Sequence, residues 1–146
     1  MFLYEDKVLH NNVYINFVRT FGYDKHISDQ FDMNHIAFPV YRGLLGYRIC
    51  FLSKKIETQF ARANTLNEIK KFSHGQGIGW SDSNILAYNS FRVIEIASYS
   101  SLFNMVAANR FDLFCRGANE VLSEHKHYGN KLQDLRLDRS KAFYYP

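Results

Sequence analysis

Three glycines, Gly75, Gly77 and Gly79, stand within five residues just before Trp80 and Asp82. A short strand-like run precedes them and an amphipathic helical pattern follows, so the backbone here can approach a ligand and direct free N–H groups at it. That arrangement suits an anion or a carboxylate. A tight strand-to-helix turn that requires glycine accounts for the pattern equally well.

The two side chains that follow the glycines each allow two interpretations. Trp80 can stack on a ligand or cover the turn, and its neighbours favour an exposed ring. Asp82 can bind a ligand amine, but an acidic residue in the first turn of a helix is also stabilised by the helix dipole. For Asp82 the dipole is the simpler explanation.

Arg116 is the strongest single candidate for ligand contact. It follows a strand-like run at 112–115 and precedes Gly117, and a guanidinium at the end of a strand can bind a carboxylate through two parallel hydrogen bonds. The alternative is a salt bridge to Glu120, one helical turn later. Glu120 can orient Arg116 or meet a ligand amine, and we favour the orienting role.

Other kinds of chemistry find little support in the residue pattern. His125 and His127 lie on different sides of a helix without a suitably spaced third ligand. No histidine motif surrounds Cys50 or Cys115, and the chain has no P-loop, dinucleotide fingerprint or zinc motif. We expect a protein that is not an enzyme and holds no cofactor or metal, with both cysteines as buried, reduced thiols.

Composition favours one globular domain. The chain has 146 residues, of which 47% are hydrophobic and 22% charged, so it can bury a core. No apolar run approaches the roughly 18 residues of a membrane span. The net charge is +4, but the 18 Lys and Arg residues are scattered, so we expect neither nucleic-acid binding nor membrane insertion. The segment 1–7 lacks the features of a secretory signal, which predicts a cytoplasmic location.

Apolar spacing and capping residues outline the elements that position the candidates. A helical face is expected over 11–21 and a connection over 23–35. From there, strands and helices alternate. The expected strands cover 36–40, 48–52, 72–76, 91–96, 112–115 and 141–145, and the expected helices cover 56–62, 66–71 after a Thr65 cap, a stretch beginning at a Ser81 cap, 99–108 and 118–127.

Several motifs in a fixed order resemble the type II extracellular solute-binding proteins of amino-acid transporters. The resemblance runs from about residue 36 to residue 146. It is carried by the run 39–48, the Gly-Gln-Gly-x-x-Trp-x-Asp loop at 75–82, Tyr99-x-x-Leu102-Phe103, Arg110-Phe111-Asp112, and Arg116-Gly117-x-x-Glu120. Members of that family have two lobes and are exported, and the resemblance implies that this chain corresponds mainly to the inserted second lobe, in truncated form.

The resemblance and the alternating pattern imply the same architecture. We expect an N-terminal helical arm and connection over 1–35, followed by one three-layer α/β/α lobe over 36–146 with a mostly parallel sheet. In such sheets ligands bind beyond the carboxyl ends of the strands. Those ends are the loops at 76–82, 97–100 and 115–120, so Tyr99 joins the candidate ligand-binding residues.

Two functions are compatible with this lobe. The first is non-enzymatic binding of an amino acid or organic acid at the residues above. The second is a protein-interaction or structural role with ancestral ligand binding lost, in which the surfaces left by the missing lobe form a dimer interface. A homodimer is expected in both cases, through exposed apolar residues such as Phe38, Tyr41, Leu44, Leu45, Tyr47, Phe143, Tyr144 and Tyr145.

Overall fold

The computed structural model describes residues 8–10, 13–15 and 44–144. The chain divides into two units, residues 1–43 and residues 44–146. In the first unit, β1 (Val8–His10) and β2 (Val13–Ile15) form an antiparallel hairpin. The helix expected over 11–21 is therefore wrong for 13–15, where β-branched and aromatic residues favour a strand. The expected connection over 23–35 and the expected strand over 36–40 lie outside the described residues.

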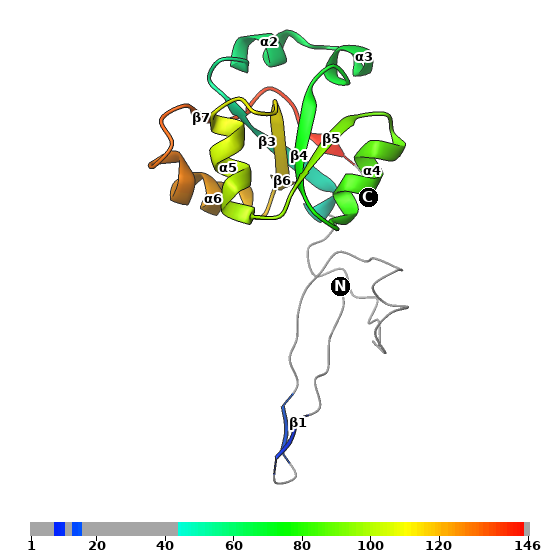
Figure 1. Ribbon diagram of the computed structural model, residues 1–146, viewed down its shortest axis with the longest axis vertical. Coiled ribbons are helices and arrows are strands. Elements are labelled where there is room, and N and C mark those ends of the chain that lie inside the picture. Colours follow the sequence, from blue (N-terminus) through cyan, green and yellow to red (C-terminus); the bar gives the residue numbers. More distant parts are fainter. Residues whose placement is uncertain (1–7, 11–12, 16–43, 145–146) are drawn as a thin grey trace. The chain divides into compact units, whose positions relative to one another are not determined.

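The second unit carries the alternating elements expected from the sequence (Figure 1). Its helices and strands follow each other with short connections. In chain order they are η1 (Leu44–Gly46), β3 (Tyr47–Ser53), α2 (Glu57–Arg62), α3 (Leu66–Ile69), β4 (Ser73–Gly77), α4 (Ser81–Tyr88), β5 (Arg92–Ile96), α5 (Tyr99–Ala107), β6 (Leu113–Gly117), α6 (Val121–Gly129), β7 (Leu135–Leu137) and β8 (Phe143–Tyr144).

One mixed sheet organises this unit. Its strand order is β5-β4-β6-β3-β7, and β8 pairs with β3. The expected parallel pairing holds for β4 with β5 and for β4 with β6. By contrast, β3 runs antiparallel to β6, β7 and β8. The α/β lobe expected from the sequence is thus present, with a mixed sheet at its centre.

The sheet has a hydrophobic core on each face, because successive side chains of a strand point to opposite faces. On β3, Phe51 belongs to one core, and Leu52 to the other. The first core lies under α5 and α6 and includes Leu102, Phe103, Val106, Phe111, Phe114 and Val121. The second lies under α2 and includes Ile56, Phe60, Phe72 and Leu113. Each fully buried side chain of this kind contributes about 1.5–3 kcal/mol.

Local signals in the sequence account for several element ends. The Thr65 hydroxyl accepts from the Glu68 backbone N–H, and the Glu68 carboxylate accepts from the Thr65 N–H, which is the capping box expected before α3. Asn109 has a φ of 54°, in the left-handed region that asparagine tolerates better than most residues. Ser90 has a φ of 64° after α4, a conformation that costs serine more.

Cys50 and Cys115 form a disulfide, which corrects the expectation of reduced thiols. Both residues are buried, as expected, with exposed fractions of 1% and 2%. The sequence separates them by 65 residues, but β3 and β6 pair in a register that sets them directly opposite each other. Their pairing depends on strand register, which the local sequence does not encode.

Three polar side chains of β4 are buried, namely those of Ser73, His74 and Gln76. His74 and Gln76 are both 0% exposed and, two residues apart, project from the same face of the strand. The His74 ring packs edge-on against Phe91 and Phe143, with centroids 5.0 and 5.5 Å away. Burial lowers the pKa of His74 to about 4, and the nearby Asp112 charge opposes that shift only in part. His74 is therefore neutral at pH 7.

Candidate ligand-binding site

The glycine loop forms a tight turn from β4 into α4. Gly79 has a φ of 76°, a conformation that favours glycine. A Cβ at Gly77 would lie 2.2 Å from the Trp80 ring, so only glycine lets the indole pack against the end of the strand. Trp80 is the N-cap of α4 and makes no side-chain capping bond, so the cap expected at Ser81 is wrong by one residue. The conformation of Gly79 and the packing of Trp80 on Gly77 therefore agree with the interpretation of the glycines as a tight turn.

Arg116 lies on β6 and is paired with two carboxylates of the following segment. Its Nη2 atom lies 2.8 Å from Glu120 Oε2, and its Nε atom lies 2.9 Å from Glu124 Oε1. The Arg116 side chain is 14% exposed. Burial opposes its charge, but Glu124 and Glu120 together raise the pKa of Arg116 above its ordinary value. The guanidinium is fully charged and held in place.

Aromatic rings surround this guanidinium. The Arg116 Cζ atom lies 4.9 Å from the Trp80 ring centroid and 5.5 Å from that of Tyr99, within cation–π range. The Tyr99 hydroxyl donates a hydrogen bond to Glu124 Oε1. Burial and this hydrogen bond raise the pKa of Tyr99, so its hydroxyl stays protonated. The structure thus brings together Trp80, Tyr99, Arg116 and Glu120, which come from four different segments of the chain.

Glu124 is the member of this cluster that the sequence analysis missed. It is 8% exposed, and its Oε2 atom is buried without a hydrogen-bond partner among the described residues. The available signal was its spacing, since Glu124 follows Glu120 by one helical turn and falls on the same side of α6. With one guanidinium and two carboxylates, the cluster has a net charge of −1. Glu120, whose side chain is 44% exposed, is its most accessible charged group.

Asp82 belongs to a separate ion pair. Its carboxylate accepts from Arg48 Nε at 3.1 Å and from Arg48 Nη2 at 3.2 Å, which joins α4 to β3. Ile49 is the register partner of Arg116, so Arg48, one residue earlier, projects from the opposite face of the sheet. Asp82 is therefore not part of the Arg116 cluster. The partner 34 residues away gives Asp82 a role beyond the helix dipole.

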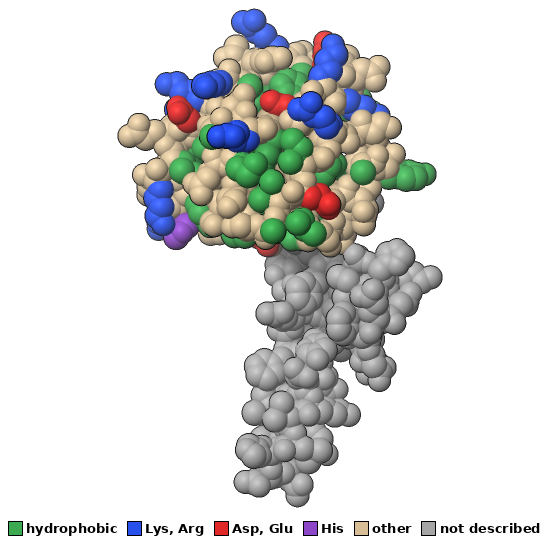
Figure 2. All heavy atoms as spheres, in the orientation of Figure 1, with side chains coloured by type: hydrophobic (Ala, Val, Ile, Leu, Met, Phe, Trp, Pro, Cys, Tyr) green, Lys and Arg blue, Asp and Glu red, His purple; other side chains and the backbone are tan. Residues whose placement is uncertain are grey.

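Metal sites and membrane spans were sought in the part of the chain that the structure describes. No group of three or more His, Cys, Asp or Glu residues there is placed to hold a metal ion, and no helix there is long and apolar enough to cross a bilayer. On the face seen in Figure 2, Lys and Arg side chains are spread among polar and apolar atoms.

Solved structures of arginine-binding proteins share this fold. An ancestral arginine-binding protein bound to glutamine matches with a TM-score of 0.57 at 14% identity, over 84% of this chain and 50% of that protein. An ancestral arginine-binding protein bound to arginine matches with a TM-score of 0.55 at 14% identity, over 85% of this chain and 50% of that protein. The sequence matches no protein-family model and no curated protein.

These matches establish the fold class. The second unit is an α/β lobe of the type II solute-binding-protein kind, as the sequence motifs led us to expect. The chain spans about half the length of each of these two structures.

Proposed function

We propose that this chain is a non-enzymatic binding domain for a small amino acid or organic acid, held beyond the carboxyl ends of β4 and β6. The observation that carries the proposal is the gathering of Trp80, Tyr99, Arg116 and Glu120 at the edge where open α/β sheets bind ligands. The two solved structures of this fold, bound to glutamine and to arginine, support an amino acid as the ligand class.

The charges of the cluster suggest how such a ligand is oriented. Because Arg116 is already paired with two carboxylates, the accessible group is the Glu120 carboxylate, which suits a ligand amine. The turn at Gly77 and Gly79 leads into the N-terminus of α4, where the helix dipole suits a ligand carboxylate. The Trp80 ring packs against Gly77 and lies within cation–π range of Arg116. Arg116 then orients Glu120, and Asp82 anchors α4 through Arg48.

Titration calorimetry with arginine, glutamine and malonate tests this proposal. Binding of either amino acid is expected, and Glu120→Gln should weaken it at least tenfold because the amine loses its charged partner. Glu57→Gln is the matched control, since Glu57 lies on α2, away from the cluster. Absence of binding by all three compounds at millimolar concentration, or equal affinities of the Glu120→Gln and wild-type proteins, would refute the proposal.

A second candidate function is self-association. Tyr47 and Tyr144 lie on paired strands with ring centroids 4.7 Å apart, and their exposed fractions are 48% and 60%. Leu44, which lies on η1 just before Tyr47, has an exposed fraction of 43%. An exposed apolar group of this kind is typical of an interaction surface. The backbones of Phe38, Tyr41 and Tyr145 and the side chain of Leu45 lie outside what the structure describes.

Sedimentation velocity at two protein concentrations tests the association. A homodimer is expected, and replacing both Tyr47 and Tyr144 by serine should shift it toward monomer. Tyr88→Ser is the control, because Tyr88 is 89% exposed on α4 and belongs to neither strand. A wild-type protein that stays monomeric at both concentrations would exclude this second function.

A further inference from the structure

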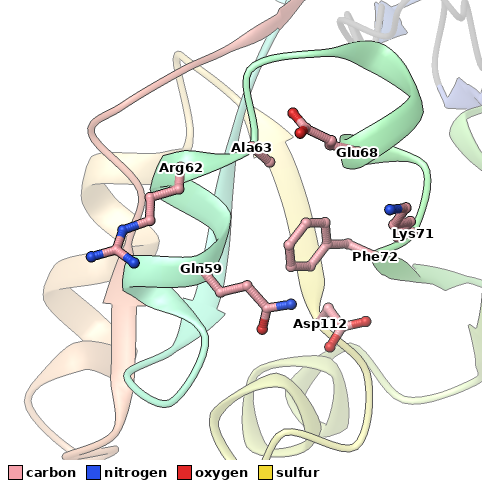
Figure 3. A pocket seen from close by; sticks show the side chains of 7 residues that line it. All are labelled: Gln59, Arg62, Ala63, Glu68, Lys71, Phe72 and Asp112. Carbon is pink, nitrogen blue, oxygen red and sulfur yellow. The ribbon is translucent and has the colours of Figure 1, made fainter.

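A cavity of about 400 Å³ is lined by Phe72, Asp112 and five further residues (Figure 3). Phe72 and Asp112 directly precede the parallel strands β4 and β6, so the cavity lies at the opposite end of these strands from the Arg116 cluster. It is bounded by α2, by α3 and by the turns that lead into β4 and β6. Its volume is within the range of small-molecule sites, roughly 300–1,000 Å³. None of the residues proposed above for ligand binding lines it, so it is a separate candidate site.

The inner wall of this cavity is apolar. Phe72 and Ala63 line it, and each is only 6% exposed. In Figure 3 the Phe72 ring lies among the lining side chains, and the Gln59 amide is directed towards Asp112. An apolar wall with a few polar groups around it is the usual composition of a small-molecule site.

Two carboxylates at the cavity are held in fixed positions by hydrogen bonds to one oxygen each. Glu68 Oε2 accepts from the backbone N–H groups of Asn64 at 2.9 Å and Thr65 at 3.0 Å. Those bonds lower the pKa of Glu68, so it stays charged. Asp112 Oδ2 accepts from both the N–H and the hydroxyl of Ser73 at 2.7 Å. Among the described residues, neither second oxygen makes a hydrogen bond.

The cations at the cavity have no such partners. Lys71 and Arg62 line it, both are exposed, and neither side chain forms a hydrogen bond or salt bridge within the described part of the chain. The Lys71 charge acts on Glu68 only from a distance, where it adds to the lowering of the Glu68 pKa. In Figure 3 the Arg62 side chain points away from Phe72, which leaves Lys71 as the cation beside the ring. Fixed carboxylates and an ammonium group without a salt bridge among the described residues thus stand around one apolar wall. A ligand with a single charge would satisfy one sign and be repelled by the other.

We propose that this cavity binds a small zwitterion with an apolar body. The ammonium group of the ligand meets Asp112, its carboxylate meets Lys71, and its apolar part packs against Phe72. The fixed Asp112 carboxylate needs little reordering when the ligand binds, which lowers the entropic cost of association.

Three matched probes test the charge pattern in the full chain. Phenylalanine carries both charges, 3-phenylpropionate lacks the ammonium group, and 2-phenylethylamine lacks the carboxylate. Backbone amide NMR spectra of the labelled protein are recorded during titration with each. Phenylalanine is expected to shift the amides of residues 59–72 and 112, and the two single-charge probes to bind at least tenfold more weakly.

Variants separate this cavity from the Arg116 cluster. Lys71→Gln and Asp112→Asn should each weaken phenylalanine binding at least fivefold, whereas Lys55→Gln, an exposed lysine outside the cavity, should not change it. The same spectra show whether each variant is folded. No shifts at 59–72, equal affinity of a single-charge probe, or unchanged affinity of the folded Lys71→Gln variant would overturn the proposal. Shifts confined to 77–82 and 116–120 would assign phenylalanine to the Arg116 cluster and equally overturn it.

Discussion

Acid is expected to destabilise this protein through His74. The folded state keeps the buried imidazole neutral down to a pKa of about 4, whereas the unfolded chain has the ordinary value near 6.5. Below pH 6.5 the unfolded state therefore takes up a proton that the folded state does not. The stability contributed by the neutral ring is complete above pH 6.5 and is lost as the pH falls towards 4. At 1.36 kcal/mol per pH unit, the loss by pH 4 is about 3 kcal/mol.

Urea unfolding between pH 7 and pH 4 measures this effect when wild type is compared with His74→Phe. Phenylalanine keeps an aromatic ring between Phe91 and Phe143 but cannot take up a proton. The free energy of unfolding of the variant, relative to wild type, should rise by about 3 kcal/mol from pH 7 to pH 4. Leu122→Phe, at an exposed position of α6, should leave the wild-type pH dependence unchanged, because neither side chain takes up a proton.

This reasoning would be refuted if the difference in unfolding free energy between wild type and His74→Phe were the same at every pH. If the curves for wild type and His74→Phe run parallel from pH 7 to pH 4, His74 titrates alike in both states. It would then be hydrated or paired in the folded protein, and the burial argument would be wrong.

Three further predictions concern stability. Gly77→Ala should lower the free energy of unfolding by about 1–3 kcal/mol, because the added Cβ would overlap the ring of Trp80. Trp80 is the single tryptophan of the chain, so the displacement of its ring should appear as a red shift of the fluorescence. Ser90→Gly should raise the stability by up to about 1 kcal/mol in urea unfolding, because glycine adopts a φ of 64° without strain. Reducing the disulfide between Cys50 and Cys115, which lie 65 residues apart in the sequence, should lower the free energy of unfolding by about 4 kcal/mol. The measurement is the midpoint of urea unfolding, which should fall accordingly.

Local sequence patterns were sufficient to predict most helices and strands of the second unit. The apolar spacing over 99–108 predicted α5, and Thr65 with Glu68 predicted the start of α3, because these signals act within one or two helical turns. Strand β7 was missed, since three residues, Leu135–Leu137, are too few to show a period. The antiparallel position of β3 was also missed, because strand pairing is decided by contacts between distant segments.

The candidate site was predictable to a similar degree. Arg116 and Glu120 lie within one turn of each other, so their salt bridge was foreseen as an alternative. The pair of Arg48 with Asp82 spans 34 residues and needs the three-dimensional fold. The same is true of the disulfide, which depends on the register of β3 against β6. A disulfide favours an oxidising compartment, and the cytoplasmic location stays a prediction.

The pairing of β3 with later strands affects how the chain folds during its synthesis. Among the described residues, the strands that pair with β3 are β6, β7 and β8, and all of them come later in the sequence. A growing chain therefore carries the apolar strand β3 without any of these three partners until at least residue 113 has been made. Long-range pairing of this kind folds slowly and exposes strand edges to aggregation. Nascent chains that stop before β6 should depend most on chaperones, and the lobe closes only when its C-terminal strands arrive.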